Sequence, residues 1–244
     1  MNHEQITAII TDNGRIPYGV GITPNPFIRQ QKEWERRRRL SSTRKVITDK
    51  IESLFEPRFI TPPETSELIE SIITITDSRI ILELGVCTGF TTLHMLRAVI
   101  GKPGARIVAV DARPAHDKAF WNDFKELQFI EGWTPDVLDG LKGTIFDLVF
   151  VDSDHSVEHT AKELGALWPI TRPGTVFLFH DVPEWQTPSN RVSPPVRDYL
   201  FSKVKDGTFQ GVMLPSCEQL DCLDVYGDGY PMKCNPGLGI FIRK

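Results

Sequence analysis

The sequence predicts an α/β fold: a doubly wound, mostly parallel, seven-stranded sheet with an N-terminal helical cap. Three observations lead to this prediction. From residue 79 onward, short apolar runs alternate with segments whose apolar residues recur at helical spacing. The short runs are apolar throughout, which is typical of strands that are buried on both faces of a parallel sheet. Acidic or glycine-rich stretches directly follow several of these runs.

Two helices are predicted ahead of the sheet. Residues 42–55 carry apolar side chains at helical spacing, Ile47 and Ile51 among them. The sequence Thr61-Pro-Pro-Glu64 has the form of a capping box with proline near the first helical position, so a second helix is expected to begin there. Because both helices precede the first strong strand, we expect them to cover one end of the sheet.

Strands and helices then alternate through the rest of the chain. The predicted strands comprise residues 79–86, 105–111, 127–130, 145–152, 175–180, 208–214 and 238–243. The predicted helices between them comprise residues 91–100, 116–127, 157–168 and 196–204. Residues 216–237 are rich in Gly, Pro and Asp, which predicts a long loop.

Composition excludes several classes of protein. Among the 244 residues, 40% are apolar and 25% are charged, which is typical of a globular domain and not of a fibrous or disordered chain. The sequence contains no run of about 18 apolar residues, and its N-terminus lacks the pattern of a secretory signal. Four cysteines are too few for a disulfide scaffold: Cys87, Cys217, Cys222 and Cys234. We therefore expect a cytoplasmic protein without a membrane partner.

Charge is distributed unevenly along the chain, whose formal net charge is −4. Residues 1–50 contain ten Lys or Arg and five Asp or Glu, and the basic residues centre on Arg36–Arg39. A solvated arm, a lid over an anionic ligand, an oligomer contact or an attraction to nucleic acid would each explain this segment. We divide the chain into an N-terminal arm with a cap helix, residues 1–60, and a ligand-binding domain, residues 61–244.

A glycine-rich turn follows the first predicted strand of the sheet. The sequence Glu83-Leu-Gly85-Val-Cys-Thr-Gly89 lies where a strand ends and a helix begins, and glycine allows backbone N–H groups to approach a ligand there. Asp111 ends the next strand, at the position from which a carboxylate accepts hydrogen bonds from ribose hydroxyls. The pattern E-x-G-x-x-x-G differs from the G-x-G-x-x-G of dinucleotide folds, so binding of a nicotinamide cofactor is the weaker interpretation.

Two further strands end in polar clusters. Asp152 and His155 follow the strand at 145–152, and His180-Asp181 ends the strand at 175–180. Open α/β sheets bind ligands at the carboxyl edge of their strands, so Asp152, His180 and Asp181 are expected to share one cleft. Three such side chains suit a divalent cation. Carboxylates favour Mg²⁺ or Mn²⁺, and imidazole shifts the preference toward Mn²⁺, Fe²⁺, Co²⁺ or Zn²⁺.

These motifs resemble a known enzyme family. The segments ILELGVCTGFTTLHMLRAV and VAVD resemble motifs I and II of class I S-adenosylmethionine-dependent methyltransferases, whose fold is Rossmann-like. The glycine-rich turn resembles that of catechol and caffeoyl-CoA O-methyltransferases. The pattern V-D-x-x-H…H-D is similar to that of O-methyltransferases that tailor macrolide sugars and cephamycins. The resemblance covers residues 65–182 well and residues 183–244 weakly, and it makes 61–244 the S-adenosylmethionine-binding catalytic domain.

For the cofactor, the resemblance implies specific roles. The backbone around Gly85 and Gly89 would pass under the methionine part of S-adenosylmethionine, and Thr91 would lie near its carboxylate. Asp111 would hold the ribose. Trp133 lies where such enzymes contact adenine, and stacking and packing are both open for it. The implied cofactor-binding residues are Glu83, Gly85, Gly89, Thr91, Asp111, Trp133 and Asp152.

For the chemistry, the resemblance implies a bound metal and a general base. The metal ligands would be Asp152, His180 and Asp181, and the catalytic residues would be His155, as general base, and Asp152. His180 departs from the family pattern, in which Glu or Asn is common. The identity of the metal is therefore open, with Mg²⁺ first and Mn²⁺ or another divalent ion as alternatives.

The predicted function is transfer of a methyl group from S-adenosylmethionine to a hydroxyl of a small molecule, assisted by the metal and the histidine. A metal that chelates two adjacent hydroxyls favours a vicinal diol, a catechol or a sugar as acceptor. The acceptor pocket is expected to come from the N-terminal segment, residues 185–195 and residues 216–237, with Trp185 and Tyr230 as aromatic walls.

Three alternatives remain open at this point. A nucleic-acid methyltransferase would explain the arginine run, but the rest of the chain is acidic and lacks the N/D-P-P-Y/F motif of amino-methylating enzymes. A non-catalytic cofactor-binding or assembly protein would keep the fold without the activity. An oxygenase could use the His and Asp cluster to bind Fe²⁺. The resemblance also allows a homo-oligomer.

Overall fold

A computed structural model describes most of one compact unit, Ser42–Lys244. The described residues are 42–51, 53, 61, 63–113, 121–182, 184–186, 196–214, 220–222, 232–235 and 237–244, of which three short strands are described by their backbone alone. Arg36–Arg39, Cys217 and Tyr230 lie outside the described residues, as does the side chain of Trp185.

The sheet confirms the predicted fold class. Seven strands lie in the order β3-β2-β1-β4-β5-β10-β7. The first five in this order pair in parallel, and β10 is antiparallel to both β5 and β7. The chain runs outward from β1 in both directions, which is the doubly wound arrangement. The strands are β1 Ile80–Leu84, β2 Arg106–Asp111, β3 Leu127–Glu131, β4 Leu148–Val151, β5 Val176–His180, β7 Phe209–Leu214 and β10 Leu238–Arg243.

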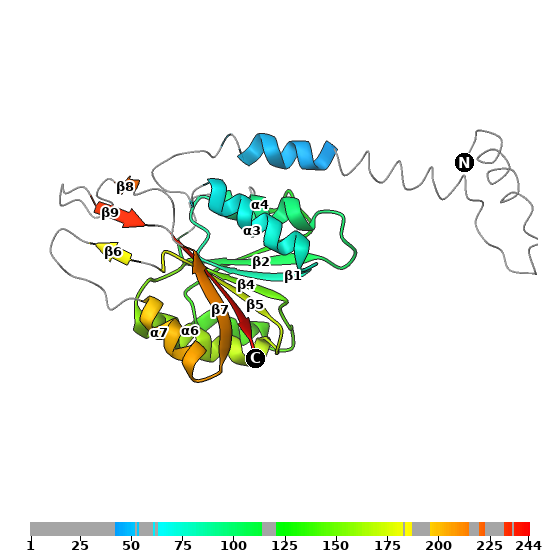
Figure 1. The fold of residues 1–244 in the computed structure, drawn as a ribbon. Helices are drawn as coiled ribbons and strands as arrows, with labels where there is room; N and C mark the ends of the chain where they lie inside the picture. The colour runs from blue at the N-terminus through cyan, green and yellow to red at the C-terminus, as the bar shows by residue number, and fades with distance from the viewer. Residues whose placement is uncertain are drawn as a thin grey trace, which may run out of the picture. The chain divides into compact units, whose positions relative to one another are not determined.

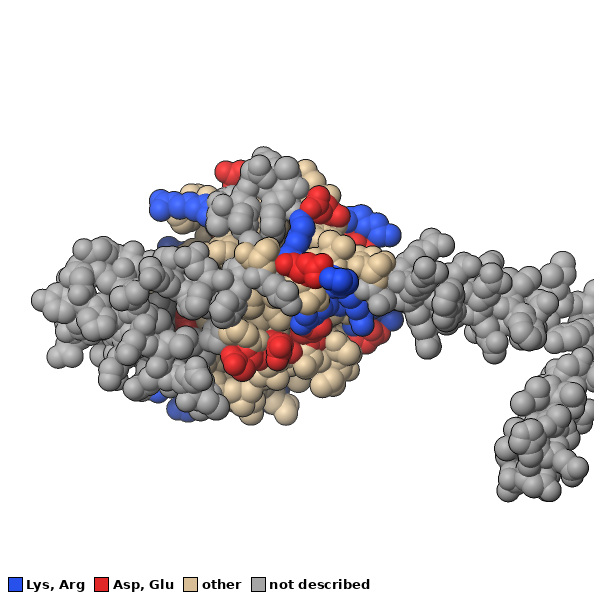
Figure 2. Space-filling model, turned by 90° about the horizontal axis from the view of Figure 1, so that it is seen from above, with Lys and Arg blue, Asp and Glu red and all other residues tan. Residues whose placement is uncertain are grey.

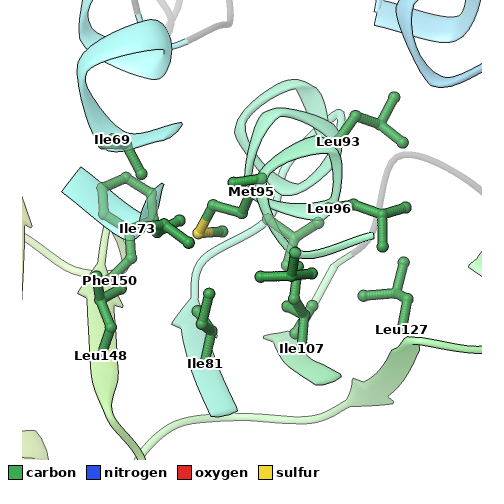
Figure 3. Close-up of a cluster of buried hydrophobic side chains, with 14 of the residues drawn as sticks. Ile69, Ile73, Ile81, Leu93, Met95, Leu96, Ile107, Leu127, Leu148 and Phe150 are labelled. Atoms are coloured by element: carbon green, nitrogen blue, oxygen red, sulfur yellow. The ribbon is translucent and has the colours of Figure 1, made fainter. Parts of the chain in front are cut away.

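Helices cover both faces of this sheet, as Figure 1 shows. On one face lie α3 (Pro63–Ile75) and α4 (Phe90–Val99), and on the other lie α6 (Val157–Leu167) and α7 (Val196–Lys205). Each face has its own apolar cluster, because every sheet strand except the edges presents apolar side chains to both sides. Figure 3 shows Ile69 and Ile73 of α3 and Met95 of α4 lying against the strands, which contribute Ile81 of β1 and Phe150 of β4 to the same cluster.

The helical cap packs onto the same compact unit. Residues 42–51 are helical, and Ile47 and Ile51 are buried in the apolar cluster that also contains residues of α3 and α4. Arg97 of α4 forms a two-pronged ion pair with Glu70 of α3 and donates a hydrogen bond to the Thr48 hydroxyl. This network joins three helices at one point. The compact unit therefore begins before residue 61, and the boundary predicted at residues 60–61 stays a prediction.

The structure departs from the predicted elements in three places. The segment expected to be helical up to residue 127 has already turned by residue 122, and β3 begins at Leu127. β4 is shorter than predicted, and just before it the Asp147 carboxylate accepts hydrogen bonds from the backbone N–H groups of Arg79 and Ile80.

The third departure lies within the predicted loop at residues 216–237. This stretch contains β8 (Leu220–Cys222) and β9 (Met232–Asn235), which pair with β6 (Glu184–Gln186) in a three-stranded antiparallel sheet. These strands are only three or four residues long and mix polar with apolar residues, so no alternation in the sequence predicts them.

The surface over the α3 and α4 side carries both signs of charge. Figure 2 shows acidic and basic side chains intermingled there, without a field of one sign. Several belong to ion pairs: Lys45–Asp49, Lys50–Asp123 and Lys102–Asp77. Among the described helices, none has the length and apolar character needed to cross a bilayer.

Candidate active site

The polar residues predicted from the sequence meet at the carboxyl edge of the sheet. They lie in the turns after β1, β2, β3, β4 and β5, which are neighbouring strands. A cleft opens between the turn after β1 and the end of β4. It is lined by Thr61, Glu83, Gly85, Val86, Cys87, Thr88, Phe90, Thr91 and Asp152. Parallel strands bring distant residues together here because all five end at the same edge.

Both glycines of the turn are required by its geometry. Gly85 has a φ of +86°, and a Cβ added to it would lie 2.1 Å from the carbonyl oxygen of Asp152. Gly89 has a φ of +81°, and its Cβ would lie 2.2 Å from the ring of Trp121. Only glycine allows the turn after β1 to lie this close to the end of β4.

Asp111 holds the turn from the neighbouring strand. One carboxylate oxygen accepts hydrogen bonds from the backbone N–H groups of Val86 (2.7 Å) and Cys87 (2.8 Å), and the other accepts one from Arg113 (2.6 Å). Three backbone donors fix a carboxylate firmly, and the oxygen that accepts a single hydrogen bond retains capacity for a further donor. The ribose-binding role of Asp111 stays a prediction.

Glu83 places a buried carboxyl group beside the cleft. Its Oε2 accepts a hydrogen bond of 2.6 Å from the Thr92 hydroxyl, and its Oε1 is buried without a partner among the described residues. Burial raises the pKa of Glu83 well above its ordinary value, and the charges of Asp152 and Asp111 act in the same direction. An unpaired buried acceptor next to a cleft fits a ligand that brings a positive charge or a donor.

Replacing Glu83 with glutamine is expected to change how stability depends on pH. Because the folded pKa is raised, the unfolded chain loses its proton first, so the wild type loses stability as pH rises above about 4.5 toward the folded pKa. Glutamine does not titrate. Thermal unfolding of wild type and Glu83→Gln from pH 4 to 8 should therefore show a gap that widens with pH in favour of the variant. Parallel curves would contradict the raised pKa.

The buried His180 and the partly exposed Asp152 form a pair at the ends of β5 and β4. The Nδ1 of His180 lies 3.0 Å from Oδ1 of Asp152 and 3.3 Å from Oδ1 of Asp181. Burial acts against the charge of His180, but the two aspartates overcome it and raise the pKa of His180 well above its ordinary value. Burial likewise opposes ionisation of Asp152, whereas His180 and His155 lower the pKa of that carboxyl group. The pair therefore favours a charged imidazole between two carboxylates.

A set of metal-type donors converges in front of this pair. Ligand atoms of Asp152, His155 and Asp181 lie within 4.8 Å of one another, and Nε2 of His155 is 3.5 Å from Oδ2 of Asp181. Asp181 has a φ of +54°, a conformation that is costly for a residue other than glycine and is found at functional sites. The predicted ligand set contained His180. In the structure His155 converges with the two aspartates, and the Nδ1 atom of His180 contacts the carboxylates of Asp152 and Asp181. The role of His180 as a metal ligand stays a prediction.

Trp133 lies in the turn after β3 with 60% of its surface exposed. The guanidinium carbon of Arg113, from the turn after β2, is 5.4 Å from the centre of its ring. An indole that is this exposed contributes little to the core, and its stacking on a base stays a prediction. Thr91, in contrast, is buried, and its hydroxyl lies 3.4 Å from that of Ser66.

Sequence reasoning missed several residues of the site. Thr61 lines the cleft and donates to Asp152; the sequence marks Thr61 as a helix cap and not as a site residue, because 91 positions separate it from Asp152. Glu163 is buried in α6 and bonds to Ser153 and Thr134. A signal for it exists: it occupies the apolar stripe of its helix, one residue before the buried Leu164, where a charge is out of place.

Comparisons with known proteins find methyltransferases. Residues 82–182 match a family described as a methyltransferase domain. Catechol O-methyltransferase B of Danio rerio is 28% identical over 145 residues, which are 54% of this chain and 50% of that protein. The chain thus spans about half the length of this curated relative.

Solved structures share the fold. An O-methyltransferase from Bacillus cereus in complex with S-adenosylhomocysteine has a TM-score of 0.55 at 18% identity, over 83% of this chain and 91% of that one. An O-methyltransferase of tomaymycin synthesis from Streptomyces achromogenes, in complex with S-adenosylmethionine, has a TM-score of 0.53 at 16% identity, over 100% and 99% of the chains. Residues 82–182 thus match a methyltransferase domain, and the chain shares its fold with these solved O-methyltransferases.

Proposed function

We propose that the protein is an O-methyltransferase that moves the methyl group of S-adenosylmethionine to a hydroxyl of a small molecule, with a divalent metal and His155 as general base. The observation that carries this proposal is the convergence of Asp152, His155 and Asp181 within 4.8 Å beside the cleft of the glycine-rich turn. The relatives in zebrafish, Bacillus cereus and Streptomyces achromogenes are O-methyltransferases, which supports the same reaction class.

The described residues fit S-adenosylmethionine. The cofactor is cationic at its sulfonium and ammonium groups, and Glu83 offers it a buried acceptor that has no partner among the described residues. Gly85 keeps the turn free of a side chain, and Asp111 keeps the turn in place while retaining acceptor capacity toward a ribose. Trp133 offers an exposed aromatic face to a base.

The same edge fits a divalent metal. Asp152 and Asp181 supply carboxylate oxygens, which suit Mg²⁺ and Mn²⁺. Bound there, the ion would lower the pKa of an acceptor hydroxyl and fix its direction. The Nε2 atom of His155 cannot both ligate the ion and take a proton. We assign the carboxylates to the metal and His155 to the proton, because its half-exposed ring remains accessible to an acceptor.

The acceptor class follows from this arrangement. Two carboxylates leave most positions around a six-coordinate ion for other oxygens, so two adjacent hydroxyls of one acceptor would bind together. The zebrafish relative is named for catechol, which is such a diol. We therefore propose a catechol, a sugar diol or another vicinal diol as the acceptor.

Calorimetric titration with S-adenosylhomocysteine tests the cofactor site. Protein treated with EDTA should bind the compound, and Asp111→Ala should weaken the affinity about 10-fold or more, because the variant loses both the anchor of the turn and an acceptor. Asp139→Ala, which changes an exposed carboxylate of the 3-10 helix Asp136–Leu141, is the matched control and should bind like the wild type. A wild type that does not bind would overturn the proposal.

The metal is tested separately. Manganese binding is followed by the loss of the free Mn²⁺ signal in electron paramagnetic resonance, which does not depend on activity. Wild type should bind one ion, and Asp181→Asn should weaken binding at least 10-fold because it removes one of two carboxylate ligands. Equal binding by both proteins would place the ion elsewhere.

A further inference from the structure

We propose that Glu163 is a positioning residue that ties the turn after β3 to the loop after β4, so that the adenine side and the chemical side of the site are held as one unit. The turn after β3 carries Trp133, and the loop after β4 carries Asp152 and His155. The meaning of these two sides rests on the proposed function, whereas the link between the loops rests on the contacts of Glu163 alone.

Glu163 gathers donors from three segments at one oxygen atom. Its Oε1 accepts a hydrogen bond of 2.7 Å from the Ser153 hydroxyl, a short one from the Thr134 hydroxyl, and one of 3.0 Å from Nε2 of His159. Thr134 and His159 also lie within hydrogen-bond distance of each other. Ser153 directly follows Asp152, and Thr134 directly follows Trp133. One buried oxygen atom thus connects the residues next to the two functional side chains.

The environment of Glu163 makes this connection strong. The side chain is 1% exposed, so water does not compete for its hydrogen bonds. Its Oε2 has no partner among the described residues, which leaves the three donors at Oε1 as the compensation for burying the group. If one of these hydrogen bonds is lost, the buried carboxyl group loses part of that compensation. The loop that is still bonded to Glu163 can then shift together with it.

A shift of the loop after β4 would reach the cofactor cleft directly. A Cβ at Gly85 would lie 3.0 Å from the backbone nitrogen of Ser153, so the glycine-rich turn and this loop are in close contact. Ser153 itself does not line the cleft. An effect of its hydroxyl on cofactor affinity must therefore pass through the position of the loop.

Hydrogen–deuterium exchange of the protein without ligand tests the link itself. Ser153→Ala should speed exchange at least threefold in residues 132–134, and Thr134→Val should do so in residues 152–155, because each change loosens the partner loop through Glu163. Thr160→Val is the matched control. It removes a buried hydroxyl from the same helix whose hydrogen bond stays within the helix and its cap. Changes confined to the loop that carries each substitution would overturn the proposal.

Affinity for S-adenosylhomocysteine tests the consequence. Ser153→Ala and Thr134→Val should each raise the Kd of the wild type about 3- to 10-fold. In the Glu163→Ala variant, each of the two substitutions should raise Kd by less than a further 2-fold. Glu163→Gln keeps an oxygen acceptor and should restore most of the affinity. If Glu163→Ala does not fold, the two hydroxyl variants still decide the question.

The outcomes separate the two proposals. A role confined to stability would lower the melting temperature of the variants and leave Kd and cross-loop exchange at wild-type values, which would overturn the positioning role. Another outcome is that the wild type fails to bind S-adenosylhomocysteine while each hydroxyl variant still speeds exchange in the opposite loop. In that case the proposed function falls and the link by Glu163 stands.

Discussion

Gly85→Ala is expected to lower the free energy of unfolding by about 3 kcal/mol and to abolish measurable binding of S-adenosylhomocysteine. A left-handed backbone costs an alanine roughly 1–2 kcal/mol, and the new Cβ would lie 2.1 Å from the carbonyl oxygen of Asp152. That atom belongs to the backbone directly after β4 and cannot turn aside as a side chain could. The turn would have to move away from Asp152, and the cleft would open.

Gly143→Ala separates the two causes. Gly143 also has a positive φ, +96°, but no atom lies within 4 Å of the position of its Cβ. This control should lose only about 1–2 kcal/mol, from the backbone conformation alone, and should bind S-adenosylhomocysteine like the wild type. Urea unfolding and calorimetry measure both quantities. Equal losses of stability in the two variants would show that the contact with Asp152 relaxes without cost.

His155→Gln is expected to reduce kcat about 10²- to 10⁴-fold, the range for removal of a general base. Affinity for S-adenosylhomocysteine should change less than 2-fold, because His155 does not line the cofactor cleft. The measurement is turnover with a panel of catechols and sugar diols. If kcat of His155→Gln with an acceptor that the wild type methylates falls by less than 10-fold, another group takes the proton.

Asp154→Asn is the matched control for this experiment. Asp154 is the neighbour of His155, and its carboxylate accepts a hydrogen bond from the backbone N–H of Ser156 at the start of α6. Asparagine keeps that acceptor. The variant should therefore retain activity within about 2-fold, which would show that the loss in His155→Gln comes from the imidazole and not from a disturbed loop.

The sheet was predictable because its signals are local. A strand buried on both faces must be apolar throughout, so the runs at β1, β2, β4 and β5 appear in the sequence itself. β6, β8 and β9 have no such constraint. They are short strands of a separate sheet, stabilised by pairing with one another, and pairing partners are not visible in a single sequence.

The candidate site divides in the same way. Glycines in a strand-to-helix turn and acids at strand ends are recognisable from their neighbours in the sequence. Gly85, Gly89, Asp111, Asp152 and Asp181 were therefore predicted as candidate site residues from the sequence. Their placement at one edge also follows from the parallel order of the strands.

By itself, the sequence determined the fold class, the edge of the sheet at which the candidate site lies and the types of side chain gathered there, because periodicity and turn chemistry depend on neighbouring residues. Only the tertiary structure decided which imidazole meets the aspartates from which side. It brings His155 into the converging donors, sets His180 between two carboxylates, and connects Glu163 to Thr134 and Ser153. These contacts join residues from different strands and helices, and their distances depend on how the packed elements approach one another.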